Sequence, residues 1–353
     1  MTVKTSVKTD QYQGHDYYLL DELLSEDHLL AREAVRDWVK QEVSPIIEDY
    51  ANRAACPAHL FKGLAEIGAF GPSLPVEYGG GGMDEIAYGV IMQELERGDS
   101  GIRSMASVQG SLVMYPIYKY AYEELKKKYL PKLGSGEMIG CFGLTEPDHG
   151  SNPNGMITRI VDDGDAYILN GAKMWISNAP FSQVAVVWAK NEAGEIQGLI
   201  VERGMEGFTT PTTHGKWSLR ASATGELVFD NVKVPKENIF PNIKGLKGPL
   251  GCLTKARYGI AWGVIGAAMD CYDTALRYSK EREQFGRPIG GFQLQQKKLA
   301  EMITEITKAQ LLNWRLGVLM SEGRATPQQV SMAKRNSCEI ATNICRDARQ
   351  MLG

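Results

Sequence analysis

The chain has 353 residues, a mass of 38.9 kDa and a formal net charge of -3 at pH 7, with 43% hydrophobic and 23% charged residues. This is the composition of a globular protein, and the length exceeds what one ordinary core needs, so we expect two or three packed units. The near-neutral charge and the lack of a long Lys or Arg run argue against a nucleic-acid partner.

Targeting and redox signals are weak. No run of 18 apolar residues is present, so no membrane span is predicted. Residues 1–30 are polar and lack the apolar stretch of a secretory signal, so a cytoplasmic protein is expected. The cysteines, without a C-x-x-C pair or zinc spacing, predict reduced, mostly buried thiols and no metal site. They are Cys56, Cys141, Cys252, Cys271, Cys338 and Cys345.

The first segment, residues 1–140, has the three- and four-residue apolar spacing of amphipathic helices. Ser25 can cap one helix, which Pro45 limits at its far end. A second helix is expected at residues 60–67, and a third begins at Asp84. Most of the apolar residues in these helices are expected to form core.

The second segment, residues 141–245, changes to short apolar runs separated by turn residues. Asn170-Gly171 follows one such run and is the strongest short signal for a hairpin. Asp230-Asn231 separates two further runs, and residues 191–194 separate another pair. Short strands at these intervals predict a small antiparallel barrel or sandwich.

The third segment, residues 246–353, returns to helical spacing over long stretches. Nearly unbroken helices are expected at residues 258–281, 293–322 and 327–351. Three such helices predict a bundle, and a four-helix bundle needs one more, so we expect the chain to stop before the last helix. The predicted fold class is therefore α+β: an N-terminal helical domain, a middle antiparallel β domain and an incomplete C-terminal helical bundle.

Five short stretches stand out from this background. They are CFGLTEPDHGS at 141–151, WIS at 175–177, ERGDSGIRS at 96–104, LGCLTKARYGIAWG at 250–263 and REQFG at 282–286. Taken singly, each has a structural interpretation, such as a turn before a strand, a core tryptophan or a solvated arginine at a helix end. Arg103 could also form a surface ion pair with Glu96, seven residues earlier on one expected helix face.

Together these stretches resemble the acyl-CoA dehydrogenases, and the likeness covers the chain from Leu20 onward. The helical, β, helical order of the segments is also that of this family. The resemblance implies an FAD-dependent enzyme that removes two hydrogens from an acyl-CoA thioester and passes electrons to electron-transfer flavoprotein. It further implies a homo-oligomer, usually a tetramer, that acts in fatty acid metabolism or in lysine and tryptophan degradation.

The resemblance assigns three groups of residues to FAD. Backbone amides and the Thr hydroxyl of residues 142–151 would stabilise the negative charge of the reduced ring, and two glycines would let the backbone approach it. Trp175 would flank the ring, and Ser177 would bond to N5 or O4. Arg282 would reach the pyrophosphate of a neighbouring subunit's FAD. The full set is Phe142, Gly143, Leu144, Thr145, Glu146, Pro147, Asp148, His149, Gly150, Ser151, Trp175, Ile176, Ser177, Arg282, Phe285, Gln293, Gln350 and Gly353.

Two stretches narrow the resemblance to the glutaryl-CoA dehydrogenase branch. Arg103 and Ser104 match an Arg-Ser pair of that branch, in which the arginine meets the distal carboxylate of the substrate. Glu96 matches the acid beside it, and Arg257 corresponds to a residue of the acyl-CoA pocket. The full substrate-binding set is Glu96, Arg103, Ser104, Ser151, Leu250, Gly251, Cys252, Leu253, Thr254, Lys255, Ala256 and Arg257.

The reaction implied is oxidative decarboxylation of glutaryl-CoA to crotonyl-CoA and CO₂. The family's catalytic base is a Glu in a Tyr-Glu-Gly-Thr-like segment, which we expect beyond Gly353, so no catalytic residue is assigned within the chain. Asn152 stands where the family usually has Asp and can keep the hydrogen bond. The alternatives are an aliphatic or non-decarboxylating acyl-CoA dehydrogenase, an oxidase that uses O₂, and a flavin- and acyl-CoA-binding chain without activity.

Overall fold

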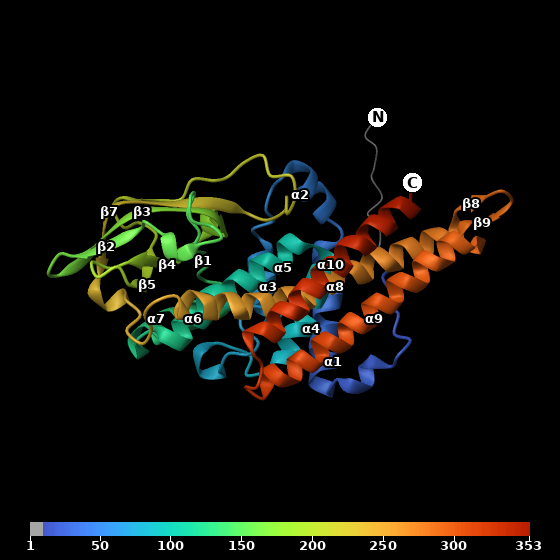
Figure 1. The fold of residues 1–353 in the computed structure, drawn as a ribbon, viewed down its shortest axis with the longest axis horizontal. Coiled ribbons are helices and arrows are strands. Elements are labelled where there is room, and N and C mark those ends of the chain that lie inside the picture. The colour runs from blue at the N-terminus through green and yellow to red at the C-terminus, as the bar shows by residue number, and fades with distance from the viewer. Residues whose placement is uncertain (1–9) are drawn as a thin grey trace. The chain divides into compact units, whose positions relative to one another are not determined.

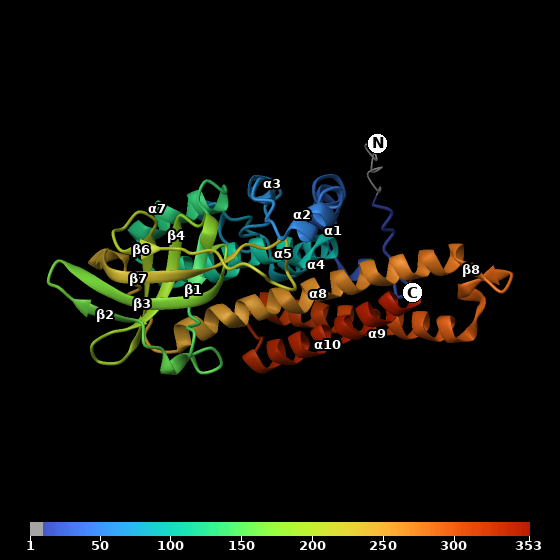
Figure 2. The same cartoon turned by 90° about the horizontal axis from the view of Figure 1, so that it is seen from above.

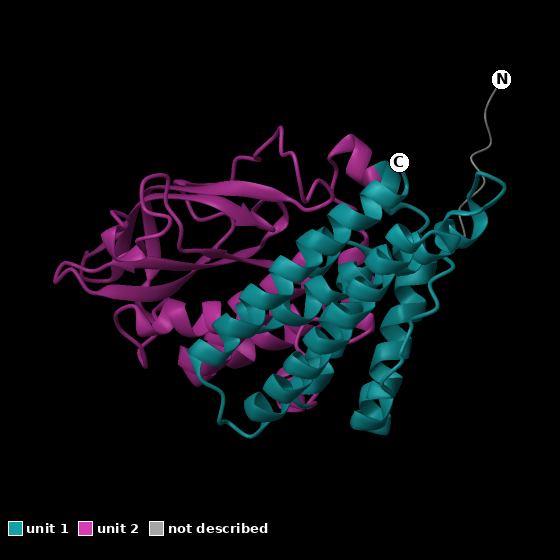
Figure 3. Ribbon diagram, turned by 45° about the vertical axis from the view of Figure 1, so that its right-hand side comes forward, with its two compact units in different colours: residues 1–49, 84–103, 257–353 teal, residues 50–83, 104–256 magenta. Residues whose placement is uncertain are grey.

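The computed structural model describes residues 10–353, so the first nine residues of the polar N-terminal stretch lie outside it. Contacts between Cα atoms divide the chain into two compact units, shown in different colours in Figure 3. Unit 1 comprises residues up to 49 with 84–103 and 257–353, and unit 2 comprises 50–83 and 104–256. Each unit therefore collects segments distant in sequence, and the division into segments 1–140, 141–245 and 246–353 stays a prediction.

Unit 1 is helical. Its helices are α1 (Glu26–Trp38), η2 (Val39–Val43), α4 (Glu85–Gly98), α9 (Gln293–Ser321), α10 (Pro327–Met351) and the short η1 (Leu20–Leu23) and η8 (Ile289–Gly291). Strands β8 (Glu283–Gln284) and β9 (Arg287–Pro288) form a small hairpin between α8 and α9. Helices α2 (Ile47–Arg53), α5 (Ser100–Ser107) and α8 (Lys247–Glu281) contribute residues to both units. Figures 1 and 2 show α9 and α10 running alongside α8.

The helix boundaries in unit 1 follow local capping signals. Ser25 Oγ accepts a hydrogen bond from His28 N at 3.3 Å, and Ser25 N donates to His28 Nδ1 at 3.1 Å, which confirms the predicted cap of α1. Thr326 and Gln329 form a second capping box at the start of α10. The three predicted C-terminal helices are present, although α8 begins at Lys247, eleven residues before the predicted start. None of the described helices is both long and apolar enough to cross a membrane.

Glycines on α8 let α4 approach closely in unit 1. A Cβ at Gly263 would collide with the Glu96 carboxylate, and one at Gly266 would collide with the backbone of Gln93. The two helices can therefore lie in contact only because these positions carry no side chain. This close approach places the Glu96 carboxylate directly against α8 at Gly263.

A buried ion-pair network holds α1 on α4. Arg36 donates to both oxygens of Glu94, at 2.7 and 3.1 Å, and Arg97 Nε donates to Glu94 Oε2 at 3.2 Å. The Arg97 guanidinium also lies 4.5 Å from the ring centroid of Tyr12 and donates to Asp10 at 3.0 Å. The charges of this network are thus paired where water is excluded.

Unit 2 is built around a seven-stranded sheet in the order β1-β4-β2-β3-β7-β6, with β5 paired to β4. The strands are β1 (Gly140–Gly143), β2 (Arg159–Asp162), β3 (Ala166–Ser177), β4 (Val184–Lys190), β5 (Ile196–Glu202), β6 (Phe208–Thr209) and β7 (Thr224–Pro235). All pairs are antiparallel except β1–β4 and a single β2–β4 pair. The helices of this unit are α3 (Leu60–Glu66), η3 (Val76–Tyr78), η4 (Val108–Met114), α6 (Tyr115–Tyr120), α7 (Glu123–Gly134), η5 (Pro153–Gly155), η6 (Ala179–Phe181) and η7 (Lys236–Asn238).

Two of the three predicted turns in the sheet are wrong. Asn170-Gly171 lies inside the continuous strand β3, and Asp230-Asn231 lies inside β7. The two sites face each other across a register shift, where Asn231 takes a left-handed conformation and its N–H donates to Asn170 Oδ1 at 2.9 Å. Residues that tolerate positive φ therefore form a β-bulge here instead of hairpin turns. The third turn, at residues 191–194, does join β4 to β5.

Candidate active site

The loop after β1, residues 144–151, is held from within by a buried ion pair. Lys173 Nζ, on β3, lies 2.8 Å from Glu146 Oε1 and donates to Leu144 O at 3.1 Å. Both side chains are almost completely buried. Glu146 also accepts hydrogen bonds from Ile157 N at 2.7 Å and Thr158 N at 3.0 Å. Every charge is thus paired and hydrogen-bonded, which a buried pair requires.

This pair changes the role assigned to Glu146. Burial alone would raise the pKa of Glu146, but the hydrogen bonds from Ile157 and Lys173 hold it below its ordinary value. Burial lowers the pKa of Lys173 to about 8, against the attraction of Glu146. Since its carboxylate points into the protein, Glu146 is positioned to shape the loop. Sequence reasoning missed Lys173, because a lysine in a strand that also contains Asn170 and Ser177 gives no sign of being buried.

Gly143, at the end of β1, and Gly150, in the loop, have different environments. A Cβ at Gly143 would lie 2.8 Å from Leu227 Cδ1 and 3.1 Å from Lys173 Cγ, so packing against β3 and β7 already accounts for this glycine. A Cβ at Gly150 would make only an ordinary contact of 3.9 Å with Thr145. A flavin ring could therefore lie close to the backbone at Gly150. At Gly143 the side chains of Leu227 and Lys173 already occupy the space.

The outer part of the loop presents unused hydrogen-bond donors. The backbone N–H groups of Asp148, Gly150 and Ser151 donate to no acceptor within residues 10–353, and all three residues are exposed. His149 and Glu146 close the turn beneath them through paired backbone hydrogen bonds of 3.2 and 3.4 Å. Such a row of N–H groups suits a carbonyl or anionic ligand. It fits the pyrimidine side of a flavin, which gathers negative charge on reduction.

Trp175 is not a core residue. It lies in a second β-bulge, where the pairing of β3 with β7 shifts between Lys173 and Ile176. Its backbone has φ 62°, and its side chain is 58% exposed. A bulky residue in the left-handed region costs about 1–2 kcal/mol, and such strain gathers at ligand sites. A large exposed ring held in this way also fits a planar cofactor.

The neighbouring residues tie this bulge to the rest of unit 2. Met174 N donates to Thr145 O at 2.9 Å, which joins the bulge to the loop after β1. Asn178 is fully buried, and its Nδ2 donates to Met105 O at 3.3 Å and to Gly140 O at 3.5 Å. The half-buried Ser177 therefore lies between Met174 and Asn178, which are both held by hydrogen bonds.

Arg103 and Glu96 form a buried pair. Arg103 Nε donates to Glu96 Oε2 at 2.7 Å, and Nη2 donates to Oε1 at 3.4 Å. Arg103 is 8% exposed and Glu96 is 3% exposed. The ion pair that the alternative interpretation placed on the surface therefore exists, but it is buried. The two residues also lie on different helices, because Asp99 is extended and caps α5 by accepting from Gly101 N and Ile102 N at 2.6 and 3.2 Å. Ser104, which follows Arg103, is buried as well.

The predicted CoA-binding stretch forms the start of α8. Cys252 and Ala256 are buried in unit 2, whereas Leu250 is 40% exposed. Lys255 Nζ donates to Ser73 Oγ at 3.1 Å, which anchors its ammonium group. The remaining members of this predicted set, Gly251, Leu253, Thr254 and Arg257, are half-buried.

Residues predicted to reach a neighbouring subunit lie on an exposed hairpin of unit 1. Phe285, at its tip, is 93% exposed with φ 53°, and Gly286 follows with φ 74°. Positive φ at both central residues defines a type I′ turn, for which a Phe is unfavourable. Arg282 and Gln293 are exposed as well. At the end of α10, Gln350 and Gly353 are exposed.

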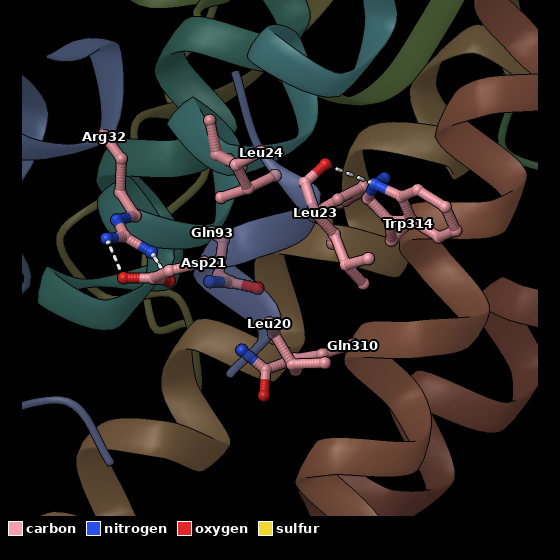
Figure 4. A pocket seen from close by; sticks show the side chains of 10 residues that line it. Leu20, Asp21, Leu23, Leu24, Arg32, Gln93, Gln310 and Trp314 are labelled. Atoms are coloured by element: carbon pink, nitrogen blue, oxygen red, sulfur yellow. Dashed lines mark hydrogen bonds and ion pairs between the residues drawn. The ribbon is translucent and has the colours of Figure 1, made fainter. Parts of the chain in front are cut away.

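A separate small hollow lies in unit 1 (Figure 4). It is lined by Leu20, Asp21, Leu23, Leu24, Arg32, Val90, Gln93, Trp262, Gln310 and Trp314. Arg32 donates to both oxygens of Asp21 at 2.5 and 2.8 Å, and Trp314 Nε1 donates to Leu23 O at 3.0 Å. These bonds fasten the N-terminal segment beside the hollow. Its lining contains no residue of the predicted site.

Comparisons with known families agree with this architecture. The models of the acyl-CoA dehydrogenase N-terminal, middle and C-terminal domains match residues 25–137, 141–232 and 244–353. The chain belongs to the acyl-CoA dehydrogenase family, which is FAD-dependent, and it has that family's fold. The predicted α+β class is thereby confirmed.

Within the family, the chain is similar to glutaryl-CoA dehydrogenases. It is 38% identical to the glutaryl-CoA dehydrogenase of Desulfococcus multivorans, over 95% of this chain and 88% of that protein. The structure of the Mycobacterium smegmatis glutaryl-CoA dehydrogenase in complex with FADH2 is 45% identical, with a TM-score of 0.92, over 94% of this chain and 86% of that one. Butyryl-CoA dehydrogenase from Megasphaera elsdenii is 30% identical, with a TM-score of 0.90, over 94% and 88%.

Proposed function

We propose that this protein is a glutaryl-CoA dehydrogenase that converts glutaryl-CoA to crotonyl-CoA and CO₂. The observation that carries the proposal is the buried Arg103, whose guanidinium is oriented by both oxygens of Glu96. An unpaired charge is costly in the pocket of an enzyme for plain aliphatic chains. A paired guanidinium can instead share its charge with the distal carboxylate of a dicarboxylic acyl chain. The similarity to glutaryl-CoA dehydrogenases supports the same conclusion.

We further infer that FAD is bound non-covalently through residues 142–151 and 175–177, with Arg282, Phe285, Gln293, Gln350 and Gly353 as further contacts. The free N–H groups of the loop and the strained, exposed Trp175 are the features that fit it. Bound FAD would supply a hydride acceptor for the β-hydrogen. The exposed hairpin around Phe285 is suited to reach the FAD of a second subunit, which implies a homo-oligomer, and a tetramer is our expectation.

The chain's own residues would bind and orient the thioester. Residues 250–257 and Ser151 are assigned to the acyl-CoA, and Arg103 would hold the distal carboxylate until CO₂ leaves. Neither Glu96 nor Glu146 suits the role of the base that removes the α-proton, because both carboxylates are committed to buried ion pairs.

The experiment is a comparison of glutaryl-CoA with butyryl-CoA as substrates of the full-length, FAD-loaded protein. Bleaching of the flavin absorbance separates an enzyme from a protein that only binds these ligands. Crotonyl-CoA with CO₂ supports decarboxylation, whereas glutaconyl-CoA would show a non-decarboxylating enzyme. A preference for butyryl-CoA would contradict the role of Arg103. Reduction of added electron-transfer flavoprotein, compared with O₂, tests the electron acceptor.

A further inference from the structure

Two cysteine thiols lie against each other in unit 1. Cys271 Sγ, on α8, is 3.5 Å from Cys345 Sγ, on α10, and both cysteines are free. The prediction of mostly buried thiols holds for Cys141 and Cys252, whereas the other four cysteines are half-buried. The sequence gives no sign of this pair, because its members stand 74 positions apart.

We infer that Cys271 and Cys345 are a redox-active pair that closes to a disulfide when the protein meets hydrogen peroxide. Sulfur atoms in a disulfide are about 2.05 Å apart, so the two must approach by roughly 1.5 Å, a displacement that side-chain rotation can supply. Both residues are half-buried, so neither is wholly closed to solvent. Cys271 also packs at the edge of an apolar cluster that includes Ile344, the neighbour of Cys345. Residues of both α8 and α10 thus pack together beside the pair.

The two cysteines differ in how readily their thiols ionise, so one is suited to attack the oxidant and the other to form the disulfide with it. The hydrogen bond with the Cys271 thiol lowers the pKa of Cys345 to about 7, although burial opposes this shift. The same bond, with burial, raises the pKa of Cys271. Cys345 therefore ionises more readily than Cys271, and its thiolate is the nucleophilic form. Cys338, two turns earlier on α10, has a raised pKa because of burial and serves as a matched control.

The oxidation has two balanced steps. The Cys345 thiolate attacks one oxygen of hydrogen peroxide, so that an S–O bond forms, the O–O bond breaks and the leaving hydroxide takes a proton to become water. The Cys271 sulfur then attacks the sulfenic sulfur, the S–S bond forms, and the hydroxyl leaves with the Cys271 proton as water. The two sulfurs lose two electrons, which peroxide gains. A dithiol reductant restores both thiols by exchange.

The test is a peptide map of the unmutated, full-length protein after brief peroxide treatment and alkylation of the remaining thiols. We expect one cross-linked peptide pair, joining Cys271 to Cys345, with the other four cysteines alkylated and the link removed by dithiothreitol. Loss of the free Cys345 thiol should be on the order of tenfold faster than loss of Cys338, because thiolate is the reactive form. No link between Cys271 and Cys345, or equal rates at Cys345 and Cys338, would overturn the inference.

Three variants sharpen the result. Cys345→Ser should abolish the cross-link, whereas Cys338→Ser should leave it unchanged. Cys271→Ser should leave Cys345 oxidised without a partner, so that a sulfenic acid is trapped by dimedone at that residue. If dimedone instead labels the unmutated protein as strongly as Cys271→Ser, then Cys271 does not resolve the sulfenic acid and the pair is not a disulfide site. The peptide map decides the question even if a variant fails to fold.

Discussion

Lys173 Nζ lies 2.8 Å from Glu146 Oε1, with both side chains closed to solvent beneath the loop that carries the predicted flavin contacts. The ammonium group also donates to Leu144 O, and the carboxylate accepts from two backbone N–H groups across the loop. One side-chain pair therefore fixes the start of the loop and the segment just before β2. The backbone N–H groups of Gly150 and Ser151, which donate to no acceptor within residues 10–353, belong to this loop.

Removing one partner should destabilise unit 2 and weaken FAD binding. Lys173→Met leaves Glu146 buried without its counter-charge, which typically costs about 3–5 kcal/mol in the free energy of unfolding. Chemical denaturation and FAD titration measure the two effects. The control is Lys236→Met, which breaks the exposed pair between Lys236, the first residue of η7, and Asp162 on β2. That change should cost much less, because solvent screens a pair between exposed groups. Equal losses for the two variants would show that the buried pair has no special role.

The same pair predicts a component of acid sensitivity. The pKa of Glu146 is lower in the folded protein than its ordinary value of 4.5. The unfolded chain therefore binds this proton first, and the stability from Glu146, present above about pH 4.5, is lost as pH falls through the lower folded pKa. Unfolding free energies measured from pH 6 to pH 3 should fall less steeply in Glu146→Gln. Parallel curves for the two proteins would contradict this assignment.

Sequence periodicity predicted the long C-terminal helices because their signals are local. The start of α10 at Pro327, for example, depends on Thr326 and Gln329, which cap the helix within one turn. The motif at residues 141–151 could be placed at the start of the sheet for the same reason. Family resemblance, more than periodicity, then supplied the cofactor and the class of reaction.

The features that were missed depend on pairing between distant residues. Asn170 and Asn231 each have the composition of a turn, and only the register of β3 on β7 places them together in a bulge. Lys173 reads as an ordinary strand residue until Glu146 is placed beneath it. Likewise, the helix break at Asp99 changes how Glu96 and Arg103 meet, although their pairing was foreseen.

Because Trp175 is strained, replacing it should affect FAD binding and the stability of the fold in opposite directions. Trp175→Gly removes an unfavourable left-handed conformation, so the apoprotein should keep its stability or gain about 1 kcal/mol. FAD affinity should nevertheless fall, because the exposed ring is lost. The control is Leu219→Gly, another exposed left-handed position of unit 2 with no predicted cofactor role. It should change stability alone. A loss of stability in Trp175→Gly with unchanged FAD affinity would make Trp175 a structural residue.

If the hairpin tip contacts a second subunit, replacing Phe285 should weaken subunit association, an effect that depends on protein concentration. Phe285→Gly should leave the unfolding of the isolated subunit unchanged or slightly improved, since the side chain is 93% exposed and its φ is positive. Association of subunits and retention of FAD on dilution should both weaken, as measured by sedimentation and flavin fluorescence. Leu294→Ala, at another exposed position of unit 1, is the matched control. Unchanged assembly in Phe285→Gly would remove the hairpin from the proposed subunit contact.

The Arg103–Glu96 pair allows specificity to be tested apart from stability. Arg103→Gln alone would leave Glu96 as a buried unpaired charge, so lower activity in that variant could reflect damage to the fold. The double variant Arg103→Gln with Glu96→Gln removes both charges and should be more stable than Arg103→Gln.

In that double variant, the ratio of kcat/KM for glutaryl-CoA to that for butyryl-CoA should fall. Loss of a charge-assisted hydrogen bond of about 1.5–3 kcal/mol corresponds to a fall of roughly 10- to 150-fold. Glu96→Gln, which keeps the arginine, is the control and should retain most of the preference for glutaryl-CoA. A double variant that folds, reduces its flavin and still prefers glutaryl-CoA by the original ratio would show that another residue recognises the distal carboxylate.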